Sequence, residues 1–178
     1  MISKSSESQV KRSAEYWIKE LHLQPHVEGG SFRETYRAEE GIRKEHLPPR
    51  YGSDRPFSTA IYFLLKSGEV SKFHRLRSDE IWHYYDGSPM TLHVIDLEGA
   101  LKRLKVGPSS ERGEHFQAVV RAGRWLGAEV AEPDSYCLAG CTVAPGFDFE
   151  DFELGKRDPL LTAYPAHREI ILKLTSET

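Results

Sequence analysis

The stretch Ser71–Gly87, SKFHRLRSDEIWHYYDG, gathers several kinds of side chain that could do chemistry. His74, Glu80 and His83 can transfer protons or bind a metal ion, and a tryptophan and two tyrosines stand among them. Side chains alternate across a β-strand, so Glu80 and His83 are expected to point to opposite faces. Catalytic metal sites commonly use three protein ligands, and only His74 and Glu80 are placed to converge. We therefore predict no resident metal and no other cofactor, and a metal that did bind would be held by His74 and Glu80.

Short strands must position these residues. Runs of β-branched and aromatic residues predict strands, and turn-forming sequences separate them at intervals typical of an antiparallel sandwich or barrel. The runs span residues 58–65, 80–85, 91–97, 101–106, 116–120, 125–130, 136–143 and 170–175. One opening helix is also expected, because Ser13 is a good N-cap residue and an apolar stripe at helical spacing runs from Ala14 to Leu21. The sequence therefore predicts an all-β chain with a short N-terminal helix.

The predicted organisation is a flexible N-terminus over residues 1–12 followed by a single domain over residues 13–178. The chain has 178 residues, a length that suits one hydrophobic core. Glu39–Pro56, with paired prolines and few apolar residues, is interpreted as a long mobile loop that is either a lid or plain surface. Strands and helices do not alternate, which disfavours a nucleotide-binding α/β sheet.

Composition narrows the expected partners. The chain carries 24 basic and 27 acidic residues for a net charge of −3, so it lacks the basic surface that nucleic acid requires. No run of apolar residues has the length of a membrane span or of a secretory signal. The two cysteines, Cys137 and Cys141, are too far apart along a strand for a disulfide and are interpreted as reduced thiols. We expect a cytoplasmic protein that binds a small molecule and contacts neither nucleic acid nor membrane.

The spacing of residues around His74 and Glu80 resembles the first cupin motif, in which a glycine, two histidines one residue apart, a glutamate and a closing glycine lie on adjacent strands of a small barrel. The position of the second histidine holds Leu76 in this sequence. A later run, VVRAGRWL, resembles the second cupin motif and places Leu126 at its histidine position. The chain therefore departs from the metal-binding cupins at both of these ligand positions.

Four segments resemble one subfamily in particular, cupin family 5, a domain of unknown function. They are HVEGGSFRETYR (His26–Arg37), STAIYFLL (Ser58–Leu65), FHRLRSDEIWHYYDG (Phe73–Gly87) and CTVAPGFDFEDFELGKRDPLL (Cys141–Leu161). The resemblance implies a double-stranded β-helix, the cupin jelly-roll barrel, that is commonly dimeric. It also implies a shape related to dTDP-4-dehydrorhamnose 3,5-epimerase rather than to the metal oxygenases.

The resemblance to that epimerase suggests catalytic residues. In such enzymes a barrel histidine is followed along the chain by a tyrosine acid and then by an aspartate that pairs with the histidine. By this order, His74, Tyr136 and Asp148 are the implied catalytic residues, with Glu80 as an alternative carboxylate to orient His74. A carboxylate within hydrogen-bond reach would fix the tautomer of an inward-facing imidazole and raise its basicity.

Aromatic and acidic side chains expected near the mouth of the barrel are the candidates for substrate binding. They are Phe32, Glu34, Tyr62, Trp82, Tyr84 and Trp125. A mostly apolar mouth with a few polar groups is typical of a small-molecule pocket, although each aromatic side chain could instead simply fill the barrel. Glu34 either reaches the interior or pairs with Arg33 or Arg37 of a neighbouring chain.

Three functions are compatible with this sequence. The first is a metal-independent isomerase or epimerase that acts on a carbohydrate-like or nucleotide-linked carbonyl compound, with His74 as the base. The second is a barrel that binds a small metabolite without catalysis, and the third is a metal-dependent cupin enzyme. In each case Ile81, Tyr85 and Phe63, on strand faces opposite the presumed pocket, predict a homodimer that forms through a sheet.

Overall fold

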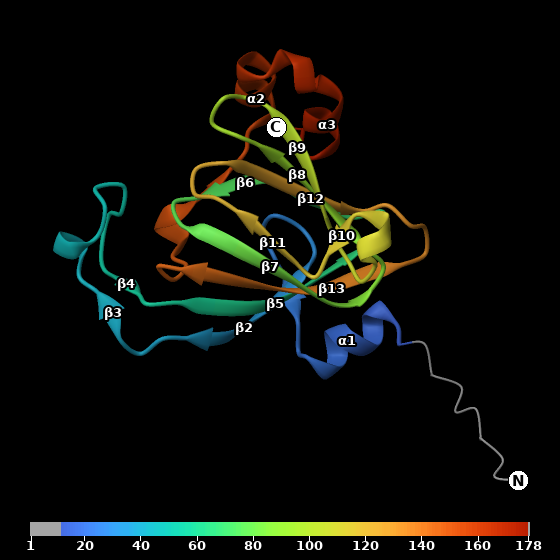
Figure 1. Ribbon diagram of the computed structural model, residues 1–178, viewed down its shortest axis with the longest axis horizontal. Coiled ribbons are helices and arrows are strands. Elements are labelled where there is room, and N and C mark those ends of the chain that lie inside the picture. The colour runs from blue at the N-terminus through green and yellow to red at the C-terminus, as the bar shows by residue number, and fades with distance from the viewer. Residues whose placement is uncertain (1–11, 178) are drawn as a thin grey trace, which may run out of the picture.

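Strands with one apolar face build two sheets that enclose the core of the protein (Figure 1). The computed structural model describes residues 12–177. The first sheet has the order β1 (Gln24–Pro25), β2 (Ser31–Arg37), β5 (Thr59–Lys66), β13 (Tyr136–Ala144), β7 (Asp79–Gly87) and β11 (Gln117–Val120). The second has the order β10 (Glu114–His115), β9 (Leu101–Val106), β8 (Met90–Ile95), β12 (Trp125–Val130), β6 (Val70–Leu76) and β14 (Phe152–Leu154). The predicted all-β barrel is confirmed.

Alternation along the strands determines which residues fill the barrel. On β13, Cys137, Ala139 and Cys141 point into the core, where they meet Phe63 of β5 and Trp82 of β7. The neighbouring strands run antiparallel, except for the short parallel pair of β10 and β9, which follows the 3₁₀ turn η2 (Ser110–Arg112). Both cysteines are buried and free, which agrees with their interpretation as thiols.

The N-terminal helix α1 (Ala14–Glu20) covers part of the outer face of the first sheet. Ser13 caps it, because its side chain accepts a hydrogen bond from the backbone N–H of Tyr16 at 3.1 Å. On its inner side the helix packs against Leu64 and Leu138. The predicted helix is thus confirmed, whereas all of the predicted flexible N-terminus except Arg12 lies outside the described residues.

Two short helices, α2 (Arg157–Ala163) and α3 (Arg168–Lys173), cover the second sheet at the C-terminal end of the chain. The 3₁₀ turn η4 (Pro165–His167) joins them. The prediction of a strand at residues 170–175 was wrong: most of this run is helical, and Ile171 and Leu174 bury their side chains against Phe73 and Trp125. Within residues 12–177, none of the helices has the length and apolar character needed to cross a membrane.

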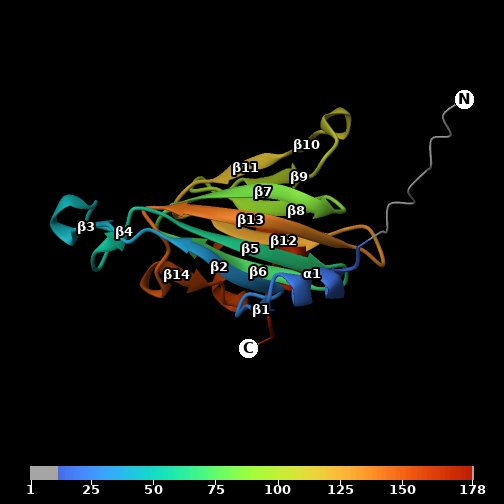
Figure 2. The same ribbon diagram turned by 90° about the horizontal axis from the view of Figure 1, so that it is seen from below.

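The segment Glu39–Pro56, predicted to be a long mobile loop, contains regular structure. Strands β3 (Gly41–Ile42) and β4 (Arg55–Pro56) pair in it, and the 3₁₀ turn η1 (Lys44–His46) lies between them. In both views the paired strands project beyond one end of the two sheets (Figures 1 and 2). The base of this projection is fixed by Arg55, whose guanidinium donates to both carboxylate oxygens of Asp151, at 2.6 and 2.8 Å.

The strand residues expected to form a dimer surface divide between the two faces of the first sheet. Tyr85 is half-exposed on the outer face, and Ile81 alternates with the buried residues of β7. Phe63, in contrast, is 1% exposed because it faces the barrel core, so its assignment to the outer face was wrong. The homodimer stays a prediction.

Replacing Arg55 by methionine should destabilise the protein strongly. Arg55 and Asp151 are 1% and 4% exposed, so the substitution leaves a buried carboxylate without its partner. We expect the free energy of unfolding to fall by about 3–5 kcal/mol, measured by urea denaturation. The matched control is Arg121→Met, which breaks a solvent-exposed pair with Asp79 and should cost less than about 1 kcal/mol. Equal losses in the two variants would contradict the anchoring role of Arg55.

Candidate functional site

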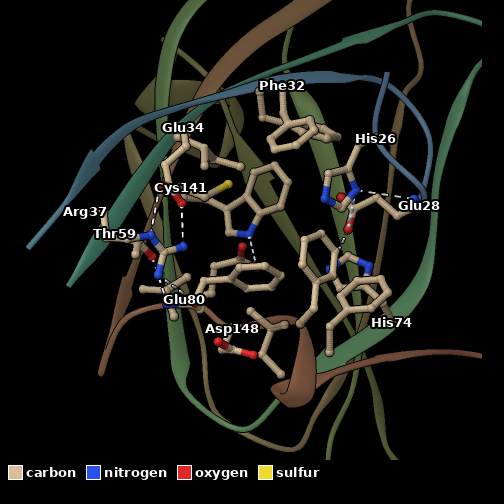
Figure 3. A pocket seen from close by; sticks show the side chains of 18 residues that line it. His26, Glu28, Phe32, Glu34, Arg37, Thr59, His74, Glu80, Cys141 and Asp148 are labelled. Atoms are coloured by element: carbon tan, nitrogen blue, oxygen red, sulfur yellow. Dashed lines mark hydrogen bonds and ion pairs between the residues drawn. The ribbon is translucent and has the colours of Figure 1, made fainter. Parts of the chain in front are cut away.

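A cavity of about 260 Å³ lies inside the barrel, lined by residues of both sheets. β2 and β5 contribute one wall, β6 contributes another, and β7 and β13 contribute Glu80, Trp82 and Cys141. The segment that ends at η3 (Phe149–Asp151) and β14 contributes Phe147, Asp148, Phe149 and Phe152. Figure 3 shows His26, Glu28 and His74 on one side of the cavity and Glu34, Arg37 and Thr59 on the other.

His74 lies in this cavity, as predicted, and is 2% exposed. Its Nδ1 is 2.8 Å from the carbonyl oxygen of Lys72, which can only accept a hydrogen bond, so Nδ1 carries a proton. The other ring nitrogen, Nε2, lies 3.3 Å from Oε2 of Glu28. The neutral imidazole therefore presents a lone pair to a carboxyl group.

Glu28 is the residue that sequence reasoning missed. Its carboxyl is 5% exposed, and Oε1 accepts a hydrogen bond from the Ser71 hydroxyl at 2.9 Å, while Oε2 is 3.5 Å from Nδ1 of His26. Burial raises the pKa of Glu28 to about 7, although the charge of His26 and the hydrogen bond from Ser71 act in the opposite direction. This carboxyl can therefore bind or release a proton at neutral pH.

Two features of the backbone bring Glu28 to His74. Gly29 has φ of +116°, and a Cβ atom there would be 2.1 Å from the carbonyl oxygen of Val70, so only glycine lets this turn approach β6 so closely. A bulge also interrupts the pairing of β6 with β12. His74 pairs with Leu126 and Ser71 pairs with Ala128, so β6 has one more residue than β12 between these two pairs. Because of this bulge, Ser71 and His74 both reach Glu28 although they are three positions apart.

Glu80 forms the second buried carboxyl of the cavity. It is 8% exposed and accepts a hydrogen bond from Nε1 of Trp82 at 2.8 Å. Burial raises the pKa of Glu80 to about 7, opposed by the charge of His74 and reinforced by the charge of Glu28. Burial also lowers the pKa values of His74 and His26, so both rings favour the neutral form. The site thus holds two carboxyls that titrate near neutrality beside two neutral imidazoles.

The opposite wall holds a charge pair. Arg37 donates to both carboxylate oxygens of Glu34, at 3.0 and 2.7 Å, and to the carbonyl oxygen of Phe147 at 3.1 Å. Glu34 therefore lines the cavity and pairs with an arginine of its own chain. Asp148 also lines the cavity, where its side chain caps η3 by accepting from the backbone N–H of Glu150 at 2.8 Å.

Tyr136, implied as the catalytic acid, is not brought into the cavity. Its hydroxyl lies beneath α1, 2.8 Å from Oδ2 of Asp86 and 3.1 Å from Nε1 of Trp17. Burial is the main cause of the raised pKa of Tyr136, about 12, which keeps the phenol protonated. This hydroxyl helps to dock the N-terminal helix onto the first sheet.

Three of the residues predicted to bind substrate also lie outside the cavity, whereas Phe32, Glu34 and Trp82 line it. Tyr84 donates to the carbonyl oxygen of Gly87 at 2.6 Å, near the turn that ends β7. Trp125 packs beneath the C-terminal helices, with the Arg75 guanidinium 4.5 Å from its ring centroid. Tyr62 packs with the cluster under α1, and its ring centroid is 5.9 Å from that of Tyr85. These three aromatic residues pack within the fold rather than line the cavity.

The residues present do not fit a resident metal ion. Within residues 12–177, no group of three or more histidine, cysteine, aspartate or glutamate side chains has an arrangement that could hold one. Leu76 and Leu126, at the positions where the resemblance to cupins calls for histidines, are buried and offer no donor atoms. The groups that the structure places in the cavity include carboxyls and imidazoles.

Comparison with known proteins assigns the chain to a family. Protein SO0799 from Shewanella oneidensis is 38% identical, with a TM-score of 0.85 over 94% of this chain and 99% of that one. A hypothetical protein from Leishmania major is also 38% identical, with a TM-score of 0.85 over 93% and 100% of the two chains. Oxalate decarboxylase from Bacillus subtilis, 14% identical with a TM-score of 0.52 over 86% of this chain and 37% of that one, shares the fold alone. None of the curated protein sequences is significantly similar. Residues 15–155 match Cupin_5, described as Cupin superfamily (DUF985), and the chain belongs to that family, as its motifs predicted.

Proposed function

We propose that this cupin is a metal-independent isomerase or epimerase that moves a proton on the carbon next to a carbonyl group. The class of substrate expected from the sequence is a carbohydrate-like or nucleotide-linked small molecule. The observation that carries the proposal is the contact between His74 and Glu28, both buried in the wall of the cavity, with Glu80 as a further acid. Groups with pKa values near 7 are the most effective general acids and bases at neutral pH.

In the proposed reaction, His74 and Glu28 together accept and return one proton. Because Nδ1 of His74 donates to Lys72, a proton shared with Glu28 resides either on Nε2 or on the carboxyl oxygen 3.3 Å away. Without that proton the pair of His74 and Glu28 acts as a general base, and with it the pair acts as a general acid. In the reaction, the carbon–hydrogen bond breaks, its electron pair forms an enolate with the carbonyl, and the proton passes to this pair.

Glu80 supplies the second half of the proposed reaction. Its carboxyl is protonated to a large extent near neutrality, since burial raises the pKa to about 7. Where the carbon that lost the proton also bears a hydroxyl group, the hydroxyl proton moves to the former carbonyl oxygen and a proton returns to the former carbonyl carbon, which gives an isomerase. Return of the proton to the opposite face of the same carbon gives an epimerase. Both outcomes conserve atoms and electrons and need no external oxidant or reductant.

The aromatic lining of the cavity also favours a second candidate function, binding of a small molecule without catalysis. Phe147, Phe149 and Phe152 cluster with ring centroids between 5.1 and 6.4 Å apart, and Phe152 stacks on His74 with centroids 5.4 Å apart. Such rings bind ligands whether or not a reaction follows. Measurement of proton exchange separates the two functions.

The chelator-treated protein should catalyse exchange of carbon-bound hydrogen with D₂O. The probes are hexoses, pentoses and dehydro-sugar nucleotides, followed by proton NMR at the carbon beside the carbonyl. His74→Gln should lower the exchange rate at least about a hundredfold, because it removes the base. The control is His83→Gln, because His83 does not line the cavity and its Nε2 hydrogen-bonds to the Thr142 hydroxyl at a distance of 3.0 Å. Full exchange by the His74 variant would refute the proposal, and saturable binding without exchange would support the non-catalytic alternative.

Glu28→Gln should change how stability depends on pH. A raised pKa means that the folded protein keeps a proton which the unfolded chain loses, so the buried Glu28 makes stability fall as the pH rises from the ordinary pKa of 4.5 through about 7, above which the effect levels off. Between about pH 5 and pH 8, wild type should lose on the order of 2–3 kcal/mol more than the variant in urea denaturation.

The histidines must be considered in the same experiment. The lowered pKa values of His26 and His74 act in the opposite sense, because they cost stability only as the pH falls below the ordinary value of 6.5. Glu153→Gln, at an exposed carboxylate paired with Arg75, serves as the control and should follow wild type. Parallel pH profiles of wild type and Glu28→Gln would show that this carboxyl titrates at an ordinary pKa.

A further inference from the structure

Acidic groups outnumber basic ones around the cavity. Glu28, Glu34, Glu80 and Asp148 all line it, and among the described lining residues Arg37 is the only side chain with a permanent positive charge. The charge of that guanidinium is paired with Glu34, which accepts two of its hydrogen bonds, and a third goes to the carbonyl oxygen of Phe147. A phosphate or carboxylate entering this space would meet several carboxyl groups and a single arginine, whose charge is already paired with Glu34.

Recognition of a phosphorylated ligand normally relies on arginine, lysine or a row of backbone N–H groups. The two buried carboxyls stand where an anion would come closest to His74, and each would have to keep its proton to tolerate one. A volume of about 260 Å³ also lies at the small end of the range for ligand pockets. The cavity is therefore ill suited to a nucleotide-linked molecule.

The same walls suit a positive charge. Aromatic rings surround the acids: Phe32 packs edge-on to His26 with centroids 4.5 Å apart, and Trp82 lies beside Glu80. Faces of aromatic rings attract ammonium groups, and the attraction is strongest where water is excluded. Carboxylates in the same cavity add a direct electrostatic attraction. This combination is found where proteins bind organic cations.

We infer that the cavity takes a compact organic cation, an ammonium-bearing small molecule, and not a phosphorylated or nucleotide-linked one. The inference rests on the proposed function only in treating this cavity as the ligand site, and it narrows the class of substrate. In this inference the ammonium group would lie against the acidic and aromatic side chains of the cavity, which Figure 3 shows, with the reacting carbon toward His74.

Binding of a cation should release protons. Near pH 7 both Glu28 and Glu80 are part-protonated, and a neighbouring positive charge favours their ionised forms. The other charged or titratable groups that face them are His26, His74, Cys141, Glu34, Arg37 and Asp148. Lowered pKa values keep the two histidines neutral, and the pKa of Cys141 is raised well above its ordinary range, so the carboxyls dominate the response. Affinity for a cation should therefore rise with pH through neutrality.

The test compares three molecules of one shape by isothermal titration calorimetry with the full chain. Choline carries a permanent positive charge, 3,3-dimethyl-1-butanol is its neutral counterpart, and 3,3-dimethylbutanoate is an anion of similar size. Choline should bind at least about tenfold more tightly than the neutral alcohol, and the anion should bind most weakly. Titrations in buffers of different ionisation enthalpy should show proton release with choline, and its affinity should increase from about pH 6 to pH 8.

Variants locate the effect in the cavity. Glu80→Gln should reduce the preference for choline over the alcohol, while Glu153→Gln, which removes an exposed carboxylate outside the cavity, should leave the preference unchanged. If Glu80→Gln does not fold, proton release by wild type still decides the question. Equal affinity for choline and the alcohol, absence of saturable choline binding, or binding without proton release would each overturn the inference.

These outcomes are separable from those of the proposed reaction, because the three probes do not react. If the protein prefers choline but catalyses no exchange of carbon-bound hydrogen, the inference of cation binding stands and the proposed isomerase activity is refuted. If exchange depends on His74 but the protein shows no preference for cations, the proposed isomerase activity stands and the inference of cation binding is refuted.

Discussion

The buried carboxyl of Glu28, held 3.3 Å from the imidazole of His74, is the interaction on which the cavity depends. Removal of water penalises a charge on either group, which raises the pKa of the acid and lowers that of the base. The ordinary order of the two pKa values is thereby reversed, because that of Glu28 rises to about 7 while that of His74 falls below its ordinary 6.5. Near neutral pH this arrangement places a carboxyl that can keep its proton beside a neutral imidazole, which are the two kinds of group that general acid–base catalysis uses.

This interaction requires the surrounding fold to be rigid at two points. Gly29 lets the turn after His26 lie against β6, and Arg55 holds the segment that carries Phe149 and Phe152 over the cavity through its bond to Asp151. The first contact brings Glu28 close to His74, and the second fixes the segment that lines the opposite part of the cavity. The segment that carries Asp151 therefore contacts both the projecting strands β3 and β4, through Arg55, and the cavity that contains His74 and Glu28.

Much of the fold could be predicted from the sequence, because alternation of apolar residues decides which strand faces are buried. The same alternation placed Glu80 and Trp82 correctly on one face of β7. It failed for residues 170–175, where β-branched residues form the buried side of a helix. It could not place Glu28, because that contact depends on a glycine turn and a strand bulge, although the titratable pair before Gly29-Gly30 was a visible signal.

The leucines at the metal-ligand positions and the raised pKa values of the acids have one physical origin. A bound cation would lower the pKa of every neighbouring carboxyl and would keep each of them ionised. Leu76 lines the cavity and Leu126 packs in the core beside it, so apolar surface occupies the place of two donors and deepens the burial of Glu80. With leucines at these two positions, the buried carboxyls keep their protons near neutral pH instead of holding an ion. Only one of the four described acids that line the cavity, Glu34, is paired with an arginine, so the inferred organic cation would neutralise the remainder.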